Sequence, residues 1–341
     1  YGGCIFYLVA VFRELVSPAS DYFAMLLLFF AVLCMAELAE TGEERVTPYG
    51  LLALCLVWAV TVKLSCAVML LLALYPAWRL LSRKKWGQIA AYLGLGLAIA
   101  LPWLVRNVII SGWPFYPFPW LDIFSVDWKI PRGYMDYDRF EIQVYAKEIY
   151  DVLQKDQPFR IWWLHWLKAQ PLVDRALVLV GWACVPAAAL LLARRVCKKP
   201  GAKMRDAAGF RKEAGLHDIL LLAALAGFLF WQFGAPLVRY GYFYVLFLPL
   251  ALGAALWRRF SSGERDKGRL CSNKRALCIF QGFVVAFLLY KGYNLGNMIM
   301  ELAAQPYYIY QQDYGSYEAF TYEVDGVEIY VPLWQGQIGY D

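Results

Sequence analysis

Charge is scarce in this chain, and its scarcity limits the class of protein. Asp, Glu, Lys and Arg make up 18% of the 341 residues, whereas soluble globular domains carry about 25%. Hydrophobic residues reach 61% and aromatic residues reach 17%. A water-soluble domain of this length would expose more charge, so the composition indicates a membrane protein.

Metal-binding and disulfide motifs are missing as well. The chain has two histidines, His165 and His217, and none of its eight cysteines belongs to a Cys-x-x-Cys pair. Most cysteines lie in apolar runs, and Cys197 and Cys271 lie in basic loops. This distribution favours small core residues or reduced thiols over a disulfide framework. It also excludes the usual spacing of a His/Cys metal site, so we predict none.

Long apolar runs are what the chain has in abundance. A helix needs about 20 apolar residues to cross about 30 Å of hydrocarbon. Most of the nine runs are long enough: 2–16, 22–39, 50–62, 64–80, 87–110, 172–193, 216–233, 240–257 and 276–295. The sequence therefore predicts an all-α polytopic membrane protein with about nine transmembrane or partly spanning helices.

Three basic loops set the predicted orientation. The segments 79–85, 194–212 and 258–275 are rich in Lys and Arg, and such loops stay on the cytoplasmic side. The loop 111–171 and the tail 297–341 then face outward. Since topology accounts for the formal charge of +6, we predict no nucleic-acid partner and expect membrane lipid to surround the spans.

Four segments follow from this orientation. Residues 1–110 contain the N-terminal membrane helices, 111–171 form the outer loop, 172–296 contain the C-terminal membrane helices, and 297–341 form an outer tail. The first segment begins inside an apolar stretch without an initiator Met, so we expect the chain to be a fragment of a longer protein.

Smaller elements are predicted outside the membrane runs. The pattern over 141–153 has helical spacing, and 158–170 (PFRIWWLHWLKAQ) resembles an interfacial helix with three tryptophans. Near the C-terminus, alternating residues around Asp325-Gly326 predict a small β-hairpin.

Lys63 divides the apolar stretch 50–80. A single helix of this length would extend about 46 Å and would place the cation in the middle of the membrane, where it is costly. Two shorter helices that meet near residues 61–65 avoid both problems. This interpretation places Lys63 near the outer surface, where Asp21 is the candidate ion-pair partner.

Cations at the outer ends of three spans suggest an anion-binding site. Lys63, Arg106 and Arg239 all fall there, and both guanidinium and ammonium groups bind phosphate oxygens. The alternative for each residue is a simple interface anchor whose side chain reaches the headgroups. We predict that the three residues bind the phosphate of a lipid-linked substrate.

Aromatic and amide side chains accompany these cations. Asn107, Trp113, Tyr116 and Tyr240 are candidates for a substrate platform, because flat rings stack on the apolar faces of sugars. The alternative is a helix cap followed by a rigid interfacial turn, since the prolines of 112–119 prevent regular structure.

Two carboxylates are candidates for the catalytic base. Asp21 and Asp127 are the candidate carboxylates for general-base chemistry, because each lies near a predicted membrane boundary. No cofactor is identified, and dependence on a divalent metal stays open.

Several short motifs resemble the GT-C-type superfamily of polytopic glycosyltransferases. These are 102–107 (PWLVRN), followed by 112–117 (GWPFYP), together with 61–63 (TVK), 239–249 (RYGYFYVLFLP) and 17–21 (SPASD). In that superfamily the threonine and lysine are usually adjacent, whereas Val62 separates them here. The last motif is similar to a turn in bacterial members of uncharacterised activity.

The resemblance implies an activity and a location. Such enzymes transfer sugars from polyprenyl-phosphate donors on the outer face of the membrane. It therefore implies a bacterial cytoplasmic (inner) membrane protein of the cell envelope, with outer loops that are periplasmic or extracellular. The superfamily's catalytic acid lies in its first outer loop, which we expect upstream of Tyr1.

Two other function classes fit the same composition. One is a transporter or polymerase component for lipid-linked oligosaccharides, which would be expected to contain internal repeats and polar residues within its spans. No repeat is evident, which counts against this class. The other is a non-catalytic scaffold of the cell envelope.

Overall fold

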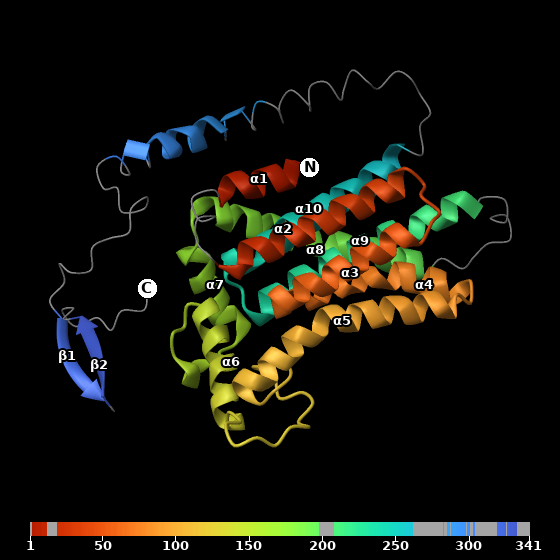
Figure 1. Ribbon diagram of the computed structural model, residues 1–341. Coiled ribbons are helices and arrows are strands. Elements are labelled where there is room, and N and C mark those ends of the chain that lie inside the picture. The colour runs from red at the N-terminus through yellow and green to blue at the C-terminus, as the bar shows by residue number, and fades with distance from the viewer. Residues whose placement is uncertain are drawn as a thin grey trace. The chain divides into compact units, whose positions relative to one another are not determined.

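The chain contains two structural units. Its computed structural model describes residues 2–11, 19–197, 208–261, 319–324 and 326–332, together with parts of 282–303. The contacts divide the chain into Tyr1–Asp266 and Lys267–Asp341. The described part of the first unit is helical, and that of the second contains a pair of strands (Figure 1).

Membrane-length helices make up most of the first unit. Among the described residues, six helical segments are long and apolar enough to cross a membrane. They are α2 (Ser20–Glu40), η2 with α4 (Leu64–Ala73 and Leu74–Ser82), α5 (Trp86–Ser111), α8 (Leu172–Cys197), α9 (Ala208–Gly234) and α10 (Val238–Ser261). The prediction of a helical, polytopic membrane protein is confirmed at this level.

Two further helices are shorter than a membrane span. α1 (Gly2–Ala10) has 9 residues and α3 (Thr47–Val62) has 16. The predicted runs at 2–16 and 276–295 lie only in part within the described residues.

The predicted break between two helices occurs at Lys63. α3 ends at Val62, and Lys63 adopts an extended backbone with φ −148° and ψ 115°. The chain then continues as a 3-10 helix over Leu64–Ala73. This confirms that residues 50–80 do not form one continuous helix, and it places the Lys63 side chain at a helix end.

The helices pack around an aromatic and aliphatic core. α10 contacts α9 and α8, while α2 contacts α3, α9 and α10 (Figure 1). Phe228, Phe243 and Tyr244 are completely buried where these helices meet. α5 differs because it packs mainly on α3 and α4, and none of its central residues is buried. One side of α3 is therefore covered by a helix that is itself largely open to its surroundings.

α5 ends at a glycine with a left-handed backbone. Gly112 has φ 77°, and its N–H donates to the Val108 carbonyl at 2.8 Å. A Cβ at this position would collide with Lys129. Glycine therefore meets both requirements, since it adopts positive φ without strain and leaves space for the returning chain.

Three helical segments form the loop between α5 and α8. They are α6 (Arg132–Ala146), η3 (Val152–Gln154) and α7 (Phe159–Ala169). α6 begins earlier than the predicted helix over 141–153, whereas α7 coincides with the predicted helix over 158–170.

The tryptophans of α7 face the helix bundle. Trp162 and Trp166 are buried, with Trp166 against Trp231 of α9 at a ring-centroid distance of 6.1 Å. The exposed apolar side chains of α7 are Ile161 and Leu164. Trp162 and Trp166 of the predicted interfacial helix therefore pack inward, because α9 provides them with an aromatic packing surface.

The described part of the second unit includes two antiparallel strands. β1 (Ala319–Val324) pairs with β2 (Val327–Pro332), and Val324 lies opposite Val327. Gly326, between the strands, has φ 79°, a conformation that the tight turn of a hairpin requires and that glycine readily adopts.

Candidate functional site

A buried carboxylate lies at the N-terminal end of α2. Asp21 occupies the first turn of this helix and is 5% exposed. The positive end of the helix dipole favours a negative charge at this place. A carboxylate this deeply buried nevertheless needs hydrogen-bonded partners, because burial of an unpaired charge is costly.

Lys63 supplies the first partner. Its Nζ donates a hydrogen bond to Oδ1 of Asp21. The same Nζ lies 3.7 Å from the centre of the Tyr240 ring, a cation–π geometry. The extended backbone at the end of α3 points this side chain toward α2 and α10 rather than along its own helix. The predicted pairing of Lys63 with Asp21 is therefore present.

Arg239 supplies the second partner from the first turn of α10. Its Nε donates to Oδ2 of Asp21 over 2.9 Å. The Arg239 side chain is 45% exposed, whereas that of Asp21 is 7% exposed. Two cations thus share one carboxylate. We refer to Asp21, Lys63 and Arg239 as the outer cluster, after the side of the membrane that the sequence predicts for them.

The outer cluster carries more positive than negative charge. Two cations and one carboxylate leave a net charge of +1, and the guanidinium of Arg239 is the part most accessible to solvent. The Asp21 bonds hold both cations in place without neutralising them. Such a fixed positive centre is suited to a singly charged anion such as a phosphodiester.

Arg106 lies in a different setting. It is exposed on α5 and lines an open groove of about 650 Å³ with residues of α3 and α5. Within the described part of the chain, its guanidinium makes no ion pair and no side-chain hydrogen bond. The structure therefore brings Lys63 and Arg239 together on Asp21, and it does not bring Arg106 onto the same carboxylate.

Asn107 and Trp113, two of the four candidate platform residues, are engaged in hydrogen bonds at the end of α5. Asn107 donates through Nδ2 to the Pro114 carbonyl over 3.0 Å. Trp113 is 3% exposed, and its Nε1 donates to the Ile130 carbonyl over 2.9 Å. These bonds fix the chain where it leaves α5, so the turn is a rigid anchor.

Tyr116 is joined to a carboxylate that sequence reasoning did not select. Its hydroxyl donates to Asp138 of α6. Partial burial, together with this nearby negative charge, raises the pKa of Tyr116 to about 12. The hydroxyl therefore stays protonated over the physiological range and links the proline-rich turn to α6.

Tyr240 and Asp127 complete the predicted set. The Tyr240 ring faces Lys63 and belongs with the outer cluster. Asp127 lies in an exposed turn of the loop between α5 and α6, and no hydrogen bond or ion pair of its side chain occurs among the described residues. Of the two candidate carboxylates, Asp21 is thus held by cations, whereas Asp127 is exposed to solvent.

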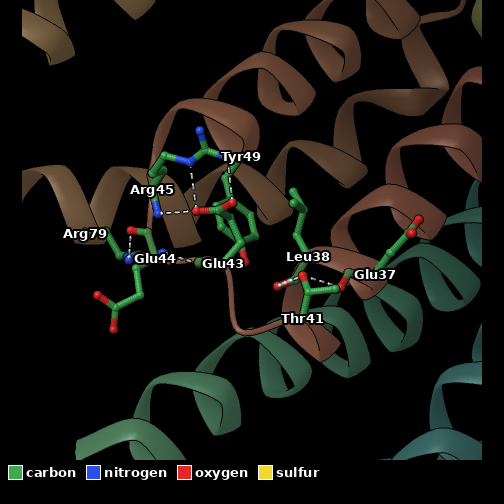
Figure 2. Close-up of polar contacts among 8 residues, drawn as sticks. All are labelled: Glu37, Leu38, Thr41, Glu43, Glu44, Arg45, Tyr49 and Arg79. Carbon is green, nitrogen blue, oxygen red and sulfur yellow. Dashed lines mark hydrogen bonds and ion pairs between the residues drawn. The ribbon is translucent and has the colours of Figure 1, made fainter.

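A second polar cluster lies at the opposite end of α2. Arg79 of α4 is buried and donates to the main-chain carbonyls of Glu43 and Glu44 (Figure 2). Nearby, the hydrogen bond from Arg45 lowers the pKa of Glu43 to about 2. The 21 residues of α2 extend about 32 Å, so the two clusters are separated by about one membrane thickness.

The contact between Arg239 and Asp21 was not predictable from the spacing of residues in the sequence. Asp21 and Arg239 are 218 residues apart, and no local pattern relates the start of α2 to the start of α10. The only indication in the sequence was that both residues fall at predicted outer helix ends. Asp138 was missed for a different reason, since it belongs to a helix of ordinary amphipathic composition.

No group of three or more His, Cys, Asp and Glu side chains that could hold a metal occurs among the described residues.

Comparisons with known proteins place the chain in a family. Searches of curated proteins and of solved structures found no match. A family model described as Domain of unknown function (DUF8201) matches residues 2–246. Because this match covers more than half of the 341 residues, the chain belongs to the DUF8201 family.

Proposed function

We propose that this protein is a membrane glycosyltransferase that transfers a sugar from a lipid-phosphate donor on the outer face of the membrane. The observation that supports this most strongly is the outer cluster, in which Asp21 fixes Lys63 and Arg239 side by side with a net positive charge. The motifs that resemble GT-C-type enzymes include residues of this cluster.

The two cations would act on the leaving group. As the acceptor oxygen bonds to the anomeric carbon, the bond between that carbon and the phosphate oxygen breaks. The phosphate leaves with the electron pair and gains negative charge. Lys63 and Arg239 stabilise this charge through charge-assisted hydrogen bonds, and their fixed positions avoid reorganisation during the reaction.

Asp21 would position the cations and not accept the proton. Both carboxylate oxygens of Asp21 already accept hydrogen bonds from cations, so neither is left to face an acceptor hydroxyl. The acceptor hydroxyl therefore needs another carboxylate as its general base. Asp127 is the candidate for this role among the residues of this chain.

The membrane orientation belongs to the same proposal. We infer about nine helices in a bacterial inner membrane, with residues 112–131 and α6 on the outer side. The positions of the outer cluster and Arg79 at opposite ends of α2 support a full crossing by this helix. Single cysteines at Gly133 and Lys84 test the orientation: an impermeant maleimide should label intact cells at 133 only, and labelling at both or only at 84 contradicts it.

Binding of the donor is the direct test. The full chain, reconstituted in lipid nanodiscs, would be titrated with a polyprenyl-phosphate sugar. Lys63→Ala and Arg239→Ala should each weaken binding at least tenfold, whereas Arg132→Ala, which removes an exposed cation of α6, should leave it unchanged. Unchanged binding in both cluster variants would refute the proposal.

One alternative is supported by the same geometry. Because Asp21 satisfies hydrogen bonds from both cations, the cluster is also suited to join α2, α3 and α10 in a non-catalytic scaffold. Arg239→Lys distinguishes the two functions, since it keeps the charge but loses the planar Nε geometry. A glycosyltransferase would lose turnover at retained thermal stability, whereas a scaffold would show no donor binding in the wild-type protein.

A further inference from the structure

An open groove lies between α3 and α5. Its lining combines apolar and aromatic side chains with one cation: Leu54, Cys55, Trp58, Thr61, Ala98, Ile99, Pro102, Trp103 and Arg106. The volume is about 650 Å³, which lies in the range of pockets that hold small ligands. Because α5 packs mainly on α3 and α4, no other described helix fills the groove.

Polarity changes along the length of the groove. Arg106 is five residues before the end of α5 at Ser111, whereas Ala98 is two turns deeper in the helix. At 1.5 Å per residue, the groove extends about 12 Å from Arg106 toward the middle of the membrane. In an α5 that crosses the bilayer, the cation would lie near the headgroups and the apolar walls near the hydrocarbon chains.

The polar groups of the groove leave Arg106 available for a ligand. Thr61 donates its hydroxyl hydrogen to the Trp58 carbonyl over 2.8 Å. By contrast, Arg106 makes no ion pair or side-chain hydrogen bond with any residue that the structure describes. A guanidinium offers paired donors that match two oxygens of one phosphate.

We propose that the groove binds one anionic phospholipid of the surrounding membrane. The phosphate would accept hydrogen bonds from Arg106, and one acyl chain would lie along Leu54, Ala98 and Ile99. The two indole rings, Trp58 and Trp103, would border the site near the headgroup. A single negative charge balances the single cation. This site is separate from the outer cluster and does not depend on the proposed transferase activity.

Retention of lipid during purification tests the proposal. The full chain would be purified in a mild detergent from membranes that contain phosphatidylglycerol and phosphatidylethanolamine, and the bound lipids would be identified by native mass spectrometry. We expect one retained phosphatidylglycerol per chain. Arg106→Gln should lower its occupancy at least fivefold, and Ala98→Trp, which fills the groove but keeps the charge, should do the same.

The control is another exposed cation outside the groove. Arg160→Gln, at the start of α7, should retain the lipid at the wild-type level, and thermal unfolding identifies any variant that is misfolded. Equal retention of phosphatidylglycerol by the wild type and by Arg106→Gln would overturn the proposal. Phosphatidylethanolamine occupancy equal to that of phosphatidylglycerol in these two proteins would overturn it as well. Recovery of a polyprenyl phosphate in place of the phospholipid would overturn it too, because the groove would then belong to a donor site.

Discussion

Asp21 accepts a hydrogen bond from Lys63 through one carboxylate oxygen and from Arg239 through the other. The three residues come from the start of α2, the end of α3 and the start of α10. A single buried carboxylate thus determines how three helix ends meet. It also keeps two cations closer together than their mutual repulsion would otherwise allow.

Removal of this carboxylate should destabilise the protein. In Asp21→Asn, Lys63 loses its negatively charged partner although the lysine side chain is only 15% exposed. Loss of one member of a buried pair typically costs about 3–5 kcal/mol. Arg239 should contribute little of this loss, because its side chain is 45% exposed and solvent screens it. Thermal unfolding in detergent, followed by circular dichroism, measures the effect.

Asp122→Asn provides the matched control. Asp122 also accepts a hydrogen bond from a lysine, Lys129, but the aspartate side chain is 61% exposed. Exposed pairs contribute about 0–1 kcal/mol, so this variant should unfold close to the wild-type temperature. Equal destabilisation by the two substitutions would show that burial does not distinguish the pairs.

Arg79 should tolerate replacement by lysine poorly. Its guanidinium donates to the carbonyls of Glu43 and Glu44 (Figure 2). It also lies near the Tyr49 and Tyr75 rings. A lysine keeps the charge but cannot reproduce the planar fork. Loss of hydrogen bonds from a buried charged group costs about 1.5–3 kcal/mol. Arg79→Lys should therefore unfold at a lower temperature and make the 41–46 loop more sensitive to protease.

The substitution Arg45→Lys is the control, because it changes an exposed arginine of the same loop and leaves the buried hydrogen bonds of Arg79 intact. Arg45 pairs with Glu43 in the same loop, but its side chain is 79% exposed. We expect no measurable change in its unfolding temperature or in cleavage of the loop. If Arg45→Lys were as sensitive to protease as Arg79→Lys, then the hydrogen bonds of the buried Arg79 guanidinium would not be what stabilises the 41–46 loop.

Local sequence patterns were sufficient for much of the helical architecture. Apolar runs predicted the long helices because a membrane requires each span to satisfy its own backbone hydrogen bonds. The cost of Lys63 in a continuous helix likewise predicted the break near residues 61–65. These features depend only on neighbouring residues and on the membrane as solvent.

Contacts between distant residues were not available from the same patterns. Lys63 and Asp21 could be paired because both fall at outer boundaries of adjacent predicted spans. Arg239 could be placed on the same side, but its bond to Asp21 depends on how α10 packs against α2. The inward orientation of Trp162 and Trp166 depends in the same way on the aromatic surface of α9. Sequence periodicity alone does not specify which helix covers a given face.

Alkaline pH should loosen the loop after α5. The pKa of Tyr116 is about 12 in the folded protein, compared with an ordinary value of about 10, because burial and Asp138 disfavour the phenolate. A raised pKa of this kind contributes stability that is present below pH 10 and is lost as the pH rises from 10 to 12. Absorbance at 295 nm, as a difference between wild type and Tyr116→Phe, reports this ionisation.

Asp138→Asn tests the cause of that shift. Removal of the negative charge should move the Tyr116 titration to lower pH, while burial still keeps it above the ordinary value. Protease cleavage of 112–131 should then begin at lower pH in this variant than in the wild type. A Tyr116 titration that is identical in the two proteins would contradict a contribution from Asp138.

Two glycines of α10 should respond in opposite directions to the same substitution. A Cβ at Gly241 would overlap the Trp231 indole, which is buried and donates to the Leu237 carbonyl over 2.9 Å. Gly241→Ala should therefore displace that ring at a cost of about 1–3 kcal/mol. A Cβ at Gly253 meets no atom within 4 Å, so Gly253→Ala should stabilise α10 by up to about 1 kcal/mol through helix propensity. Thermal unfolding of the two variants measures both effects, and destabilisation by Gly253→Ala of the same size would show that the loss at Gly241 arises from the helix and not from contact with Trp231.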